Sequence, residues 1–559
     1  MHGARCTVEE EVSGASPTLG PGPGQRAGES PGRRLTRLDY LIAALIFALI
    51  LLEGLHTIHQ VGISWDEPFY FGIARGYLDW AKRLGQGGAF SAETLERTFN
   101  LNPPKYDSPI LAKLIGVITL GLFQERLGDF WAFRLSAPLL FGILLAGVYL
   151  RAAPVWGRPA GLLAALCLGS LPRFFTDSHI AATDAPLSVF WFLAVWAFEA
   201  ACARRRLIPL AGIAYGLVMA VKFTGFLIPL PLIAWALLYR RRTMWWPVVS
   251  LILLGPLVFI LLEPAIWDHV GTDLILFVER SITRKAWNPR WVLFLGQAYN
   301  FSPPWYYAPV MVAVTVPALT LALFLLGGIR ALQSRVRDRL AGSCLIHFAF
   351  FIFLTMAPNA PLFDGVRLFL PAFVFLGILA GYGGAGLLGW VTARVRAGRS
   401  SLPVLRSPRV LAALVAAALA LGIVSPLLGA YPYGLEYYNE LIGGVKGARE
   451  RGLETTYWWT VVNESTLADL NRRLPAQAAL RFFPMDADMW NLYRRLGLLR
   501  QDFRMTEGTD FDYLLVLSRP YWNYGPIFRY VGVPQARLQP VDSLVVDGVP
   551  FWVLYQRLP

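Results

Sequence analysis

Long apolar stretches are the feature of this sequence that most restricts its fold. They recur between residues 39 and 428 at the length of membrane-crossing helices, because a bilayer core about 30 Å thick needs roughly 20 apolar residues per helix. Only 16% of the 559 residues are charged, against about 25% in soluble domains. We therefore expect a polytopic α-helical membrane protein with about eleven spans. The spans are predicted at 39–57, 131–150, 159–176, 183–202, 207–222, 224–240, 246–263, 305–328, 341–357, 367–391 and 409–428.

Basic residues indicate how these spans are oriented. Clusters at 33–37, 151–158, 204–206, 240–242, 330–339 and 394–409 all fall on one side of the predicted membrane. Loops rich in Lys and Arg stay in the cytoplasm. The net charge of +14 is therefore interpreted as a topology signal and not as a nucleic acid-binding face. The odd number of spans predicts a cytoplasmic N-terminus and a C-terminus outside.

This topology divides the chain into three parts. Residues 1–38, rich in Gly, Pro and Ser, are predicted to be a disordered cytoplasmic tail. Residues 39–428 are predicted to form the membrane domain, with long outer loops at 58–130 and 264–304. Residues 429–559 are predicted to form a small α/β domain outside the cytoplasm.

Shorter patterns predict the elements of these outer regions. Pro68–Leu84 has helical spacing of aromatic and aliphatic residues. Ile110–Phe123 is too short to span and is bounded by charged residues, so it is predicted to lie on the outer surface. In the C-terminal part, 511–517 and 545–555 are rich in strand-forming residues, and 464–474 has a helical pattern.

Two acidic segments are candidates for chemistry. Asp66 and Glu67 follow the first span among aromatic residues, at a depth where charge is costly without a use. A pair of carboxylates that merely caps a helix is the alternative. Asp184 lies at the predicted outer end of its span, where Thr183-Asp184-Ala-Pro186 is also a good helix start.

Several segments in fixed order resemble one class of membrane enzymes. They are Trp65-Asp66-Glu67, Gly128–Leu135, Ala181–Leu187, Gly216–Thr224, and Glu436–Gly444 followed by Tyr457–Trp459. With this topology, the chain is similar to the GT-C glycosyltransferases. The closer resemblance is to bacterial and archaeal relatives of the protein O-mannosyltransferases and to the aminoarabinose transferases of lipid A.

The resemblance implies a reaction and a set of roles. A monosaccharide on a polyprenyl phosphate would be transferred, with inversion, to a hydroxyl of a protein, lipid or glycan outside the cytoplasm. Asp66 would be the general base, Glu67 would orient it or bond the acceptor, and Asp184 would converge on the same cavity. The expected location is the plasma (inner) membrane of a bacterium.

The leaving phosphate needs cations, and Arg and Lys near the predicted outer ends are the candidates. They are Lys222, Arg367, Arg280, Arg284 and Lys105. Lys105 stands in Asn102–Pro109, where many relatives carry His-Pro-Pro or Glu-Lys-Pro. The roles of those residues do not carry over directly, and Lys105 and Asp107 are the candidates to substitute for them. Arg367 has an alternative partner in Asp364, and the pair Arg280 and Arg284 is also compatible with a headgroup-facing helix surface.

The spacing of the His and Cys residues and the positions of the acidic residues bear on a metal site and on two other functions. The histidines and the four cysteines show no HExxH or CxxC spacing, so no metal site is predicted, while a divalent cofactor stays open. The alternative to a transferase is a multi-spanning lipid or solute transporter in which Asp66 and Asp184 couple to ions. Transporters place such residues near span centres rather than at outer ends. A non-catalytic scaffold is the third possibility.

Overall fold

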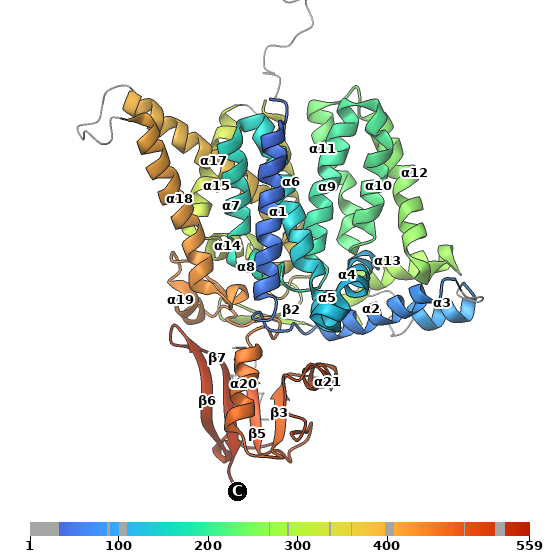
Figure 1. Cartoon of the computed structure of the whole chain (residues 1–559), viewed down its shortest axis with the longest axis vertical. Helices are drawn as coiled ribbons and strands as arrows, with labels where there is room; N and C mark the ends of the chain where they lie inside the picture. Colours follow the sequence, from blue (N-terminus) through green and yellow to red (C-terminus); the bar gives the residue numbers. More distant parts are fainter. Residues whose placement is uncertain are drawn as a thin grey trace, which may run out of the picture.

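A helical bundle joined at one end to a β-sheet is the architecture of the chain (Figure 1). The computed structural model describes residues 33–85, 90–99, 109–267, 269–287, 290–334, 337–358, 360–396, 407–485, 487–519 and 531–559. Residues 1–32, most of the predicted cytoplasmic tail, lie outside these ranges. The helices of the bundle run roughly side by side, and the chain returns to one end of the bundle for its last part.

Six helices in the described residues are long and apolar enough to cross a membrane, or seven if one bent pair is a single span. The long helices are α1 (Arg37–Thr57), α5 with α6 (Asp129–Arg134 and Ser136–Trp156), α9 (Asp184–Ala203), α12 (Trp245–Leu262), α17 (Pro371–Arg396) and α18 (Pro408–Ala430). The bent pair is α14 (Tyr307–Thr315) with α15 (Ala318–Gln333). Shorter members are α7 (Arg158–Gly169), α8 (Pro172–Asp177), α10 (Ile208–Met219), α11 (Pro229–Tyr239) and α16 (Arg339–Thr355). A polytopic helical membrane protein is therefore confirmed, whereas the number of eleven spans stays a prediction.

Proline explains where the predicted spans differ from the observed helices. The predicted span 159–176 is divided into α7 and α8 because Leu171, which precedes Pro172, is extended (φ −71°, ψ 111°). The predicted span 305–328 corresponds to α14 and α15, which meet at 119°. There Val316 is extended (φ −85°, ψ 129°) ahead of Pro317.

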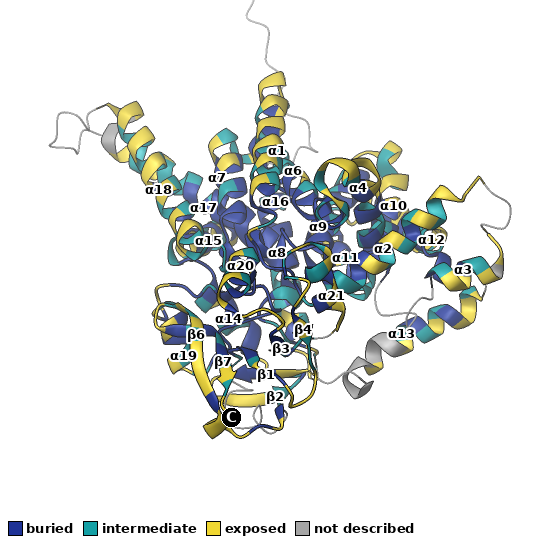
Figure 2. Ribbon diagram, turned by 60° about the horizontal axis from the view of Figure 1, so that its bottom comes forward, coloured by how far each residue is buried: buried dark blue, intermediate teal, exposed yellow. Residues whose placement is uncertain are grey.

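Small residues allow the helices of the bundle to approach closely. A Cβ at Gly327 of α15 would collide with the carbonyl oxygen of Leu379 in α17, and a Cβ at Gly383 would collide with that of Leu323. Such contacts between small residues are the usual way in which helices associate in a membrane. This packing leaves α17 buried along much of its length (Figure 2).

Several helices lie across the end of the bundle that faces the C-terminal sheet. They are α2 (Glu67–Lys82), α3 (Ala92–Phe99), α4 (Leu111–Leu127) and α13 (Val270–Trp287). The patterns at 68–84 and 110–123 thus form helices as predicted. A hairpin of β1 (Trp291–Phe294) and β2 (Gln297–Asn300), which the sequence patterns did not predict, follows α13.

The C-terminal part contains a five-stranded mixed sheet in the order β4-β3-β5-β7-β6. Its elements are α19 (Gly444–Glu450), α20 (Glu464–Arg473), β3 (Ala479–Phe483), α21 (Ala487–Arg495), β4 (Arg504–Met505), β5 (Tyr513–Leu517), β6 (Leu538–Val546) and β7 (Val549–Arg557). β3 is parallel to β4 and β5, and the other pairs are antiparallel. The stretch 545–555, rich in strand-forming residues, contains the end of β6, a turn at Asp547 and Gly548, which both have positive φ, and most of β7.

A buried ion pair connects the loop that follows α1 to the bundle. Both side chains, Glu67 at the start of α2 and Arg134 at the end of α5, are fully buried and lie 2.8 Å apart. The carboxylate also accepts from two backbone N–H groups, and the guanidinium donates to three backbone carbonyls. These backbone partners are Ser64 and Ala181 for Glu67, and Ile58, Val61 and Gly62 for Arg134. The pair therefore fixes the backbone on which Asp66 stands.

Replacing Glu67 with Gln should destabilise the fold strongly, because Arg134 would then be a buried charge without its ionic partner. Breaking one side of a buried pair costs about 3–5 kcal/mol. The thermal unfolding midpoint of the purified protein in detergent should fall well below that of the wild type. Asp129→Asn is the matched control, since its pair with Arg495 is exposed and weak. Equal midpoints for Glu67→Gln and Asp129→Asn would contradict this role.

Candidate functional site

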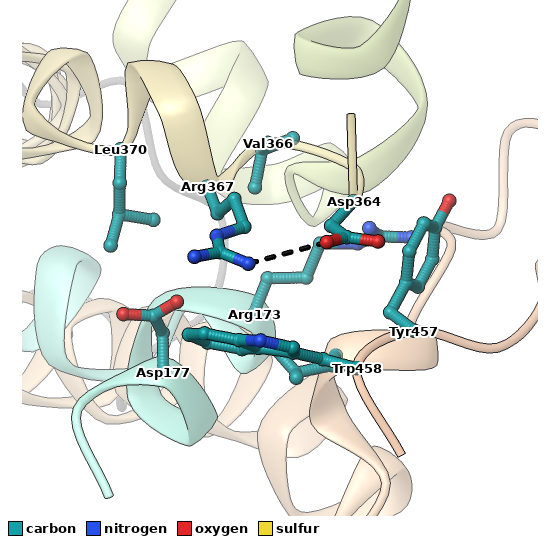
Figure 3. A pocket seen from close by; sticks show the side chains of 9 residues that line it. Arg173, Asp177, Asp364, Val366, Arg367, Leu370, Tyr457 and Trp458 are labelled. Atoms are coloured by element: carbon teal, nitrogen blue, oxygen red, sulfur yellow. Dashed lines mark hydrogen bonds and ion pairs between the residues drawn. The ribbon is translucent and has the colours of Figure 1, made fainter. Parts of the chain in front are cut away.

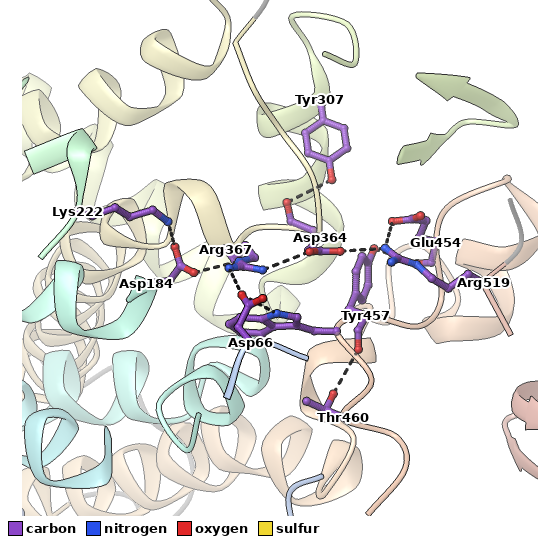
Figure 4. Close-up of polar contacts among 12 residues, drawn as sticks. Asp66, Asp184, Lys222, Tyr307, Asp364, Arg367, Glu454, Tyr457, Thr460 and Arg519 are labelled. Atoms are coloured by element: carbon purple, nitrogen blue, oxygen red, sulfur yellow. Dashed lines mark hydrogen bonds and ion pairs between the residues drawn. The ribbon is translucent and has the colours of Figure 1, made fainter. Parts of the chain in front are cut away.

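One guanidinium lies at the centre of the candidate site. Arg367, in the turn before α17, contacts three carboxylates: Oδ2 of Asp66 at 3.1 Å, Oδ2 of Asp184 at 3.0 Å and Oδ2 of Asp364 at 3.2 Å (Figure 4). The guanidinium also lies 3.8 Å from the ring centroid of Trp458, a favourable cation–π distance. Residues from four separate segments of the chain, counting the segment of Arg367 itself, therefore meet at this guanidinium.

Asp66 is held by one oxygen and open at the other. Oδ2 accepts from Arg367 and, at 3.1 Å, from the indole N–H of Trp458. No described residue donates to Oδ1, and the side chain is 29% exposed. An ionised carboxylate has acceptor capacity at both oxygens, so Oδ1 is available to a substrate hydroxyl.

The two other acidic candidates from the sequence lie deeper. Asp184 is the first residue of α9, with its Oδ1 paired to Lys222 and its Oδ2 to Arg367. The N-cap position of that helix belongs to Thr183, so the carboxylate serves the ionic cluster. Glu67, by contrast, faces Arg134 and is fully buried, which favours a positioning role over contact with an acceptor.

The C-terminal part of the chain reaches this cluster through a second arginine. Arg519, just after β5, donates to Oδ1 of Asp364 at 2.8 Å and lies 3.5 Å from Glu454. Burial opposes ionisation of Asp364, but Arg519 and Arg367 outweigh it and hold the pKa of that carboxyl below its usual value. Burial raises the pKa of Glu454 to about 7, although Arg519 acts in the opposite direction.

A cavity lies beside Arg367, as Figure 3 shows. Arg367, Asp364, Arg173 and Asp177 supply its polar lining. Its other walls are Val366, Leu370, Leu435, Tyr457 and Trp458. Its volume is about 10 Å³, enough for about one water molecule. The cavity is therefore polar on several sides and directly adjacent to the ionic cluster.

Four of the sequence candidates, Asp66, Asp184, Lys222 and Arg367, come together in this cluster. Lys105 and the side chains of Arg280 and Arg284 lie outside the described residues. Within the described residues, no group of three or more His, Cys, Asp or Glu side chains is arranged to hold a metal ion.

Sequence reasoning missed Arg173, Asp177, Trp458 and Arg519. Arg173 lies within a predicted span and Asp177 just beyond it, and charge at membrane depth was the available signal. Trp458 was part of a quoted segment but had no role assigned. Arg519 follows a strand in an ordinary surface pattern, so nothing in the sequence pointed to it.

Comparisons with known proteins agree with this architecture. Residues 107–267 match the family model described as dolichyl-phosphate-mannose-protein mannosyltransferase. The structure is similar to that of ArnT from Cupriavidus metallidurans in the apo state, with a TM-score of 0.51 and 15% identity over 92% of this chain and 97% of that chain. No curated protein matches the sequence significantly.

Two other solved structures are more weakly similar. ArnT from the same organism bound to undecaprenyl phosphate gives a TM-score of 0.48 and 17% identity, over 92% of this chain and 97% of that chain. Arabinosyltransferase EmbB from Mycobacterium smegmatis gives a TM-score of 0.38 and 16% identity, over 94% of this chain and 47% of that chain. The family match over residues 107–267 and the fold shared with apo ArnT confirm the resemblance found in the sequence.

Proposed function

We propose that this protein transfers a monosaccharide from a polyprenyl-phosphate-linked donor to an acceptor hydroxyl outside the cytoplasm. The observation that carries the proposal is the state of Asp66, which is fixed at Oδ2 by Arg367 and Trp458 and open at Oδ1. The family that residues 107–267 match is named for a dolichyl-phosphate-linked donor. A carboxylate base beside clustered cations fits that kind of donor.

Asp66 is the general base of this proposed reaction. The acceptor oxygen forms a bond to the anomeric carbon while the bond between that carbon and the phosphate oxygen breaks. The hydroxyl proton passes to Oδ1 of Asp66, and the electron pair of the broken bond stays on the lipid phosphate. The two donors on Oδ2 keep Oδ1 in one orientation, which favours proton transfer along a fixed line.

Lys222 and Arg367 are the cations for the leaving phosphate. Both form ion pairs with Asp184. The phosphate would therefore accept hydrogen bonds from side chains that the carboxylates already hold in place. Arg367 donates one hydrogen bond through each of its three nitrogens, and its two NH₂ groups each have a second hydrogen to offer. An Arg fork suits a phosphate beside apolar walls.

The membrane orientation of the proposal follows the charge pattern. The N-terminus lies in the cytoplasm, and the end of the bundle that carries Asp66 and the C-terminal sheet lies outside. The proposed location is a bacterial plasma membrane. The acceptor is a protein, lipid or glycan hydroxyl that reaches Asp66 from the side of the sheet.

Replacing Asp66 with Asn should abolish transfer, because the amide cannot accept the proton. In the native host, a deletion strain complemented with Asp66→Asn should accumulate a polyprenyl-phosphate monosaccharide that the wild-type complement consumes. Mass spectrometry of lipid extracts at matched expression measures this pool, and the lipid mass gives the sugar class. Asp129→Asn, an exposed acidic residue, should behave as the wild type. Matching lipid pools in all strains, with the pathway active, would instead favour a transporter or scaffold.

Replacing Arg367 with Lys should reduce the rate of transfer by about a hundredfold or more, as expected when a preorganised charged donor is lost. A Lys ammonium is a point charge and cannot reach three carboxylates in the fork geometry of Arg. Transfer from the accumulated donor lipid, assayed in membrane vesicles, measures the effect. Arg495→Lys, whose pair with Asp129 is exposed, is the matched control. A rate within twofold of wild type for Arg367→Lys would overturn the role of Arg367.

A further inference from the structure

Asp364 joins Arg367 to the C-terminal part of the chain. Its Oδ2 accepts from Arg367, and its Oδ1 accepts from Arg519, just after β5 (Figure 4). We propose that Arg519 is a positioning residue for the transfer reaction: it balances the charge of Asp364, so that Arg367 binds the phosphate of the donor more strongly. This inference rests on the proposed function and adds to the same site a residue that acts without contacting the donor.

The turn that carries Asp364 and Arg367 is held in place by the bundle. The hydroxyl group of Tyr307, a buried residue of α14, donates to the carbonyl oxygen of Gly365 at 3.2 Å. A Cβ at Gly365 would come within 2.6 Å of Nη1 of Arg173, so the turn is also closely packed. Asp364 and Gly365 both have positive φ, a conformation that few residues other than Gly, Asn and Asp adopt. The backbone therefore keeps the carboxylate of Asp364 beside Arg367, and a second cation is needed to balance its charge.

Arg519 is that second cation, and the C-terminal sheet presents it to Asp364. The backbone N–H of the preceding residue, Ser518, donates to the carbonyl oxygen of Phe551 in β7 at 2.9 Å, which extends the pairing of β5 with β7. The guanidinium of Arg519 lies 2.8 Å from Asp364 and 3.5 Å from Glu454. Charge-assisted hydrogen bonds are strongest at the shorter of these distances, so Asp364 is the main partner of the two carboxyl groups.

The charges around Asp364 set the direction of the effect. The cations that act on this carboxylate are, from the strongest to the weakest, Arg519, Arg367 and Arg290. Without Arg519, the carboxylate would be balanced by Arg367, which already faces Asp66 and Asp184, and by the exposed Arg290, whose charge is screened by water. An uncompensated carboxylate so close to Arg367 would weaken the attraction of the site for a phosphate.

Two simpler roles of Arg519 predict a different pattern. If it only fixed the C-terminal part to the bundle, or attracted the phosphate by its own charge, its replacement would weaken binding equally with Asp364 charged or neutral. If it acts through Asp364, its effect disappears once that carboxylate is neutral. A double-mutant cycle separates these cases. The loss of the contact between Arg519 and Glu454 occurs in both backgrounds and therefore cancels, as do the unchanged charges of Lys222, Arg173 and Asp177.

Binding of a bare polyprenyl phosphate, titrated into the full chain in nanodiscs, tests this inference. Arg519→Gln should weaken binding about tenfold in the wild-type background, as expected for one uncompensated charge several ångströms from the phosphate. In the Asp364→Asn background the same substitution should change the affinity by no more than about twofold. Arg519→Lys, which keeps the charge but not the fork geometry, should lose about threefold in the first background and nothing in the second. Asp364→Asn alone should bind at least as tightly as the wild type.

Arg537→Gln, at an exposed position of the C-terminal part, is the matched control and should bind as the wild type does. Thermal unfolding midpoints show which variants are folded, and Arg519→Lys carries the comparison if Arg519→Gln does not fold. Equal losses in the two backgrounds, no loss in either, or weaker binding by Asp364→Asn than by the wild type would overturn the inference and leave the proposed function standing. A wild type that does not bind the polyprenyl phosphate would overturn the proposed function itself.

Discussion

The sharing of one guanidinium by three carboxylates is the constraint on which the site depends. Asp66, Asp184 and Asp364 all contact Arg367, and none of them would be stable so close to the others without it, since like charges in a poorly solvated site repel strongly. The cluster also explains why the bundle brings its segments together at this end. The loop that follows α1, the start of α9 and the turn before α17 each place a charged side chain at the same point.

The C-terminal part completes this arrangement and is more than a cover. The backbone N–H of Trp65 donates to the carbonyl oxygen of Trp458, and the indole of Trp458 donates to Asp66. Its neighbour Trp459 donates to Tyr493 in α21, and both tryptophans have positive φ. A bulky residue in that region is strained and persists only where the surroundings determine it. The C-terminal part thus orients Asp66 directly.

Sequence patterns predicted the elements better than their assembly. The lengths of the apolar stretches predicted the positions of the described helices of the bundle. They did not predict the breaks between α7 and α8 or between α14 and α15, because those breaks come from the local conformation of the residue before a proline. The cost of charge at membrane depth pointed to Asp66, Lys222 and Arg367, and the family resemblance pointed to Asp184. Sequence patterns could not predict that these residues contact one another, since Asp184 and Arg367 are far apart in the chain. The contacts of Trp458 and Arg519 arise only from the packing of the C-terminal part.

The central claim is that the donor reacts between Asp66 and Arg367. A structure of the full chain in nanodiscs, bound to a phosphonate analogue of a polyprenyl-phosphate hexose, tests it most directly. The phosphonate should lie within hydrogen-bond distance of Arg367 or Lys222, and the anomeric carbon should face Oδ1 of Asp66. A headgroup bound elsewhere on the bundle, with Arg367 still on its three carboxylates and Asp66 facing no sugar, would contradict the account.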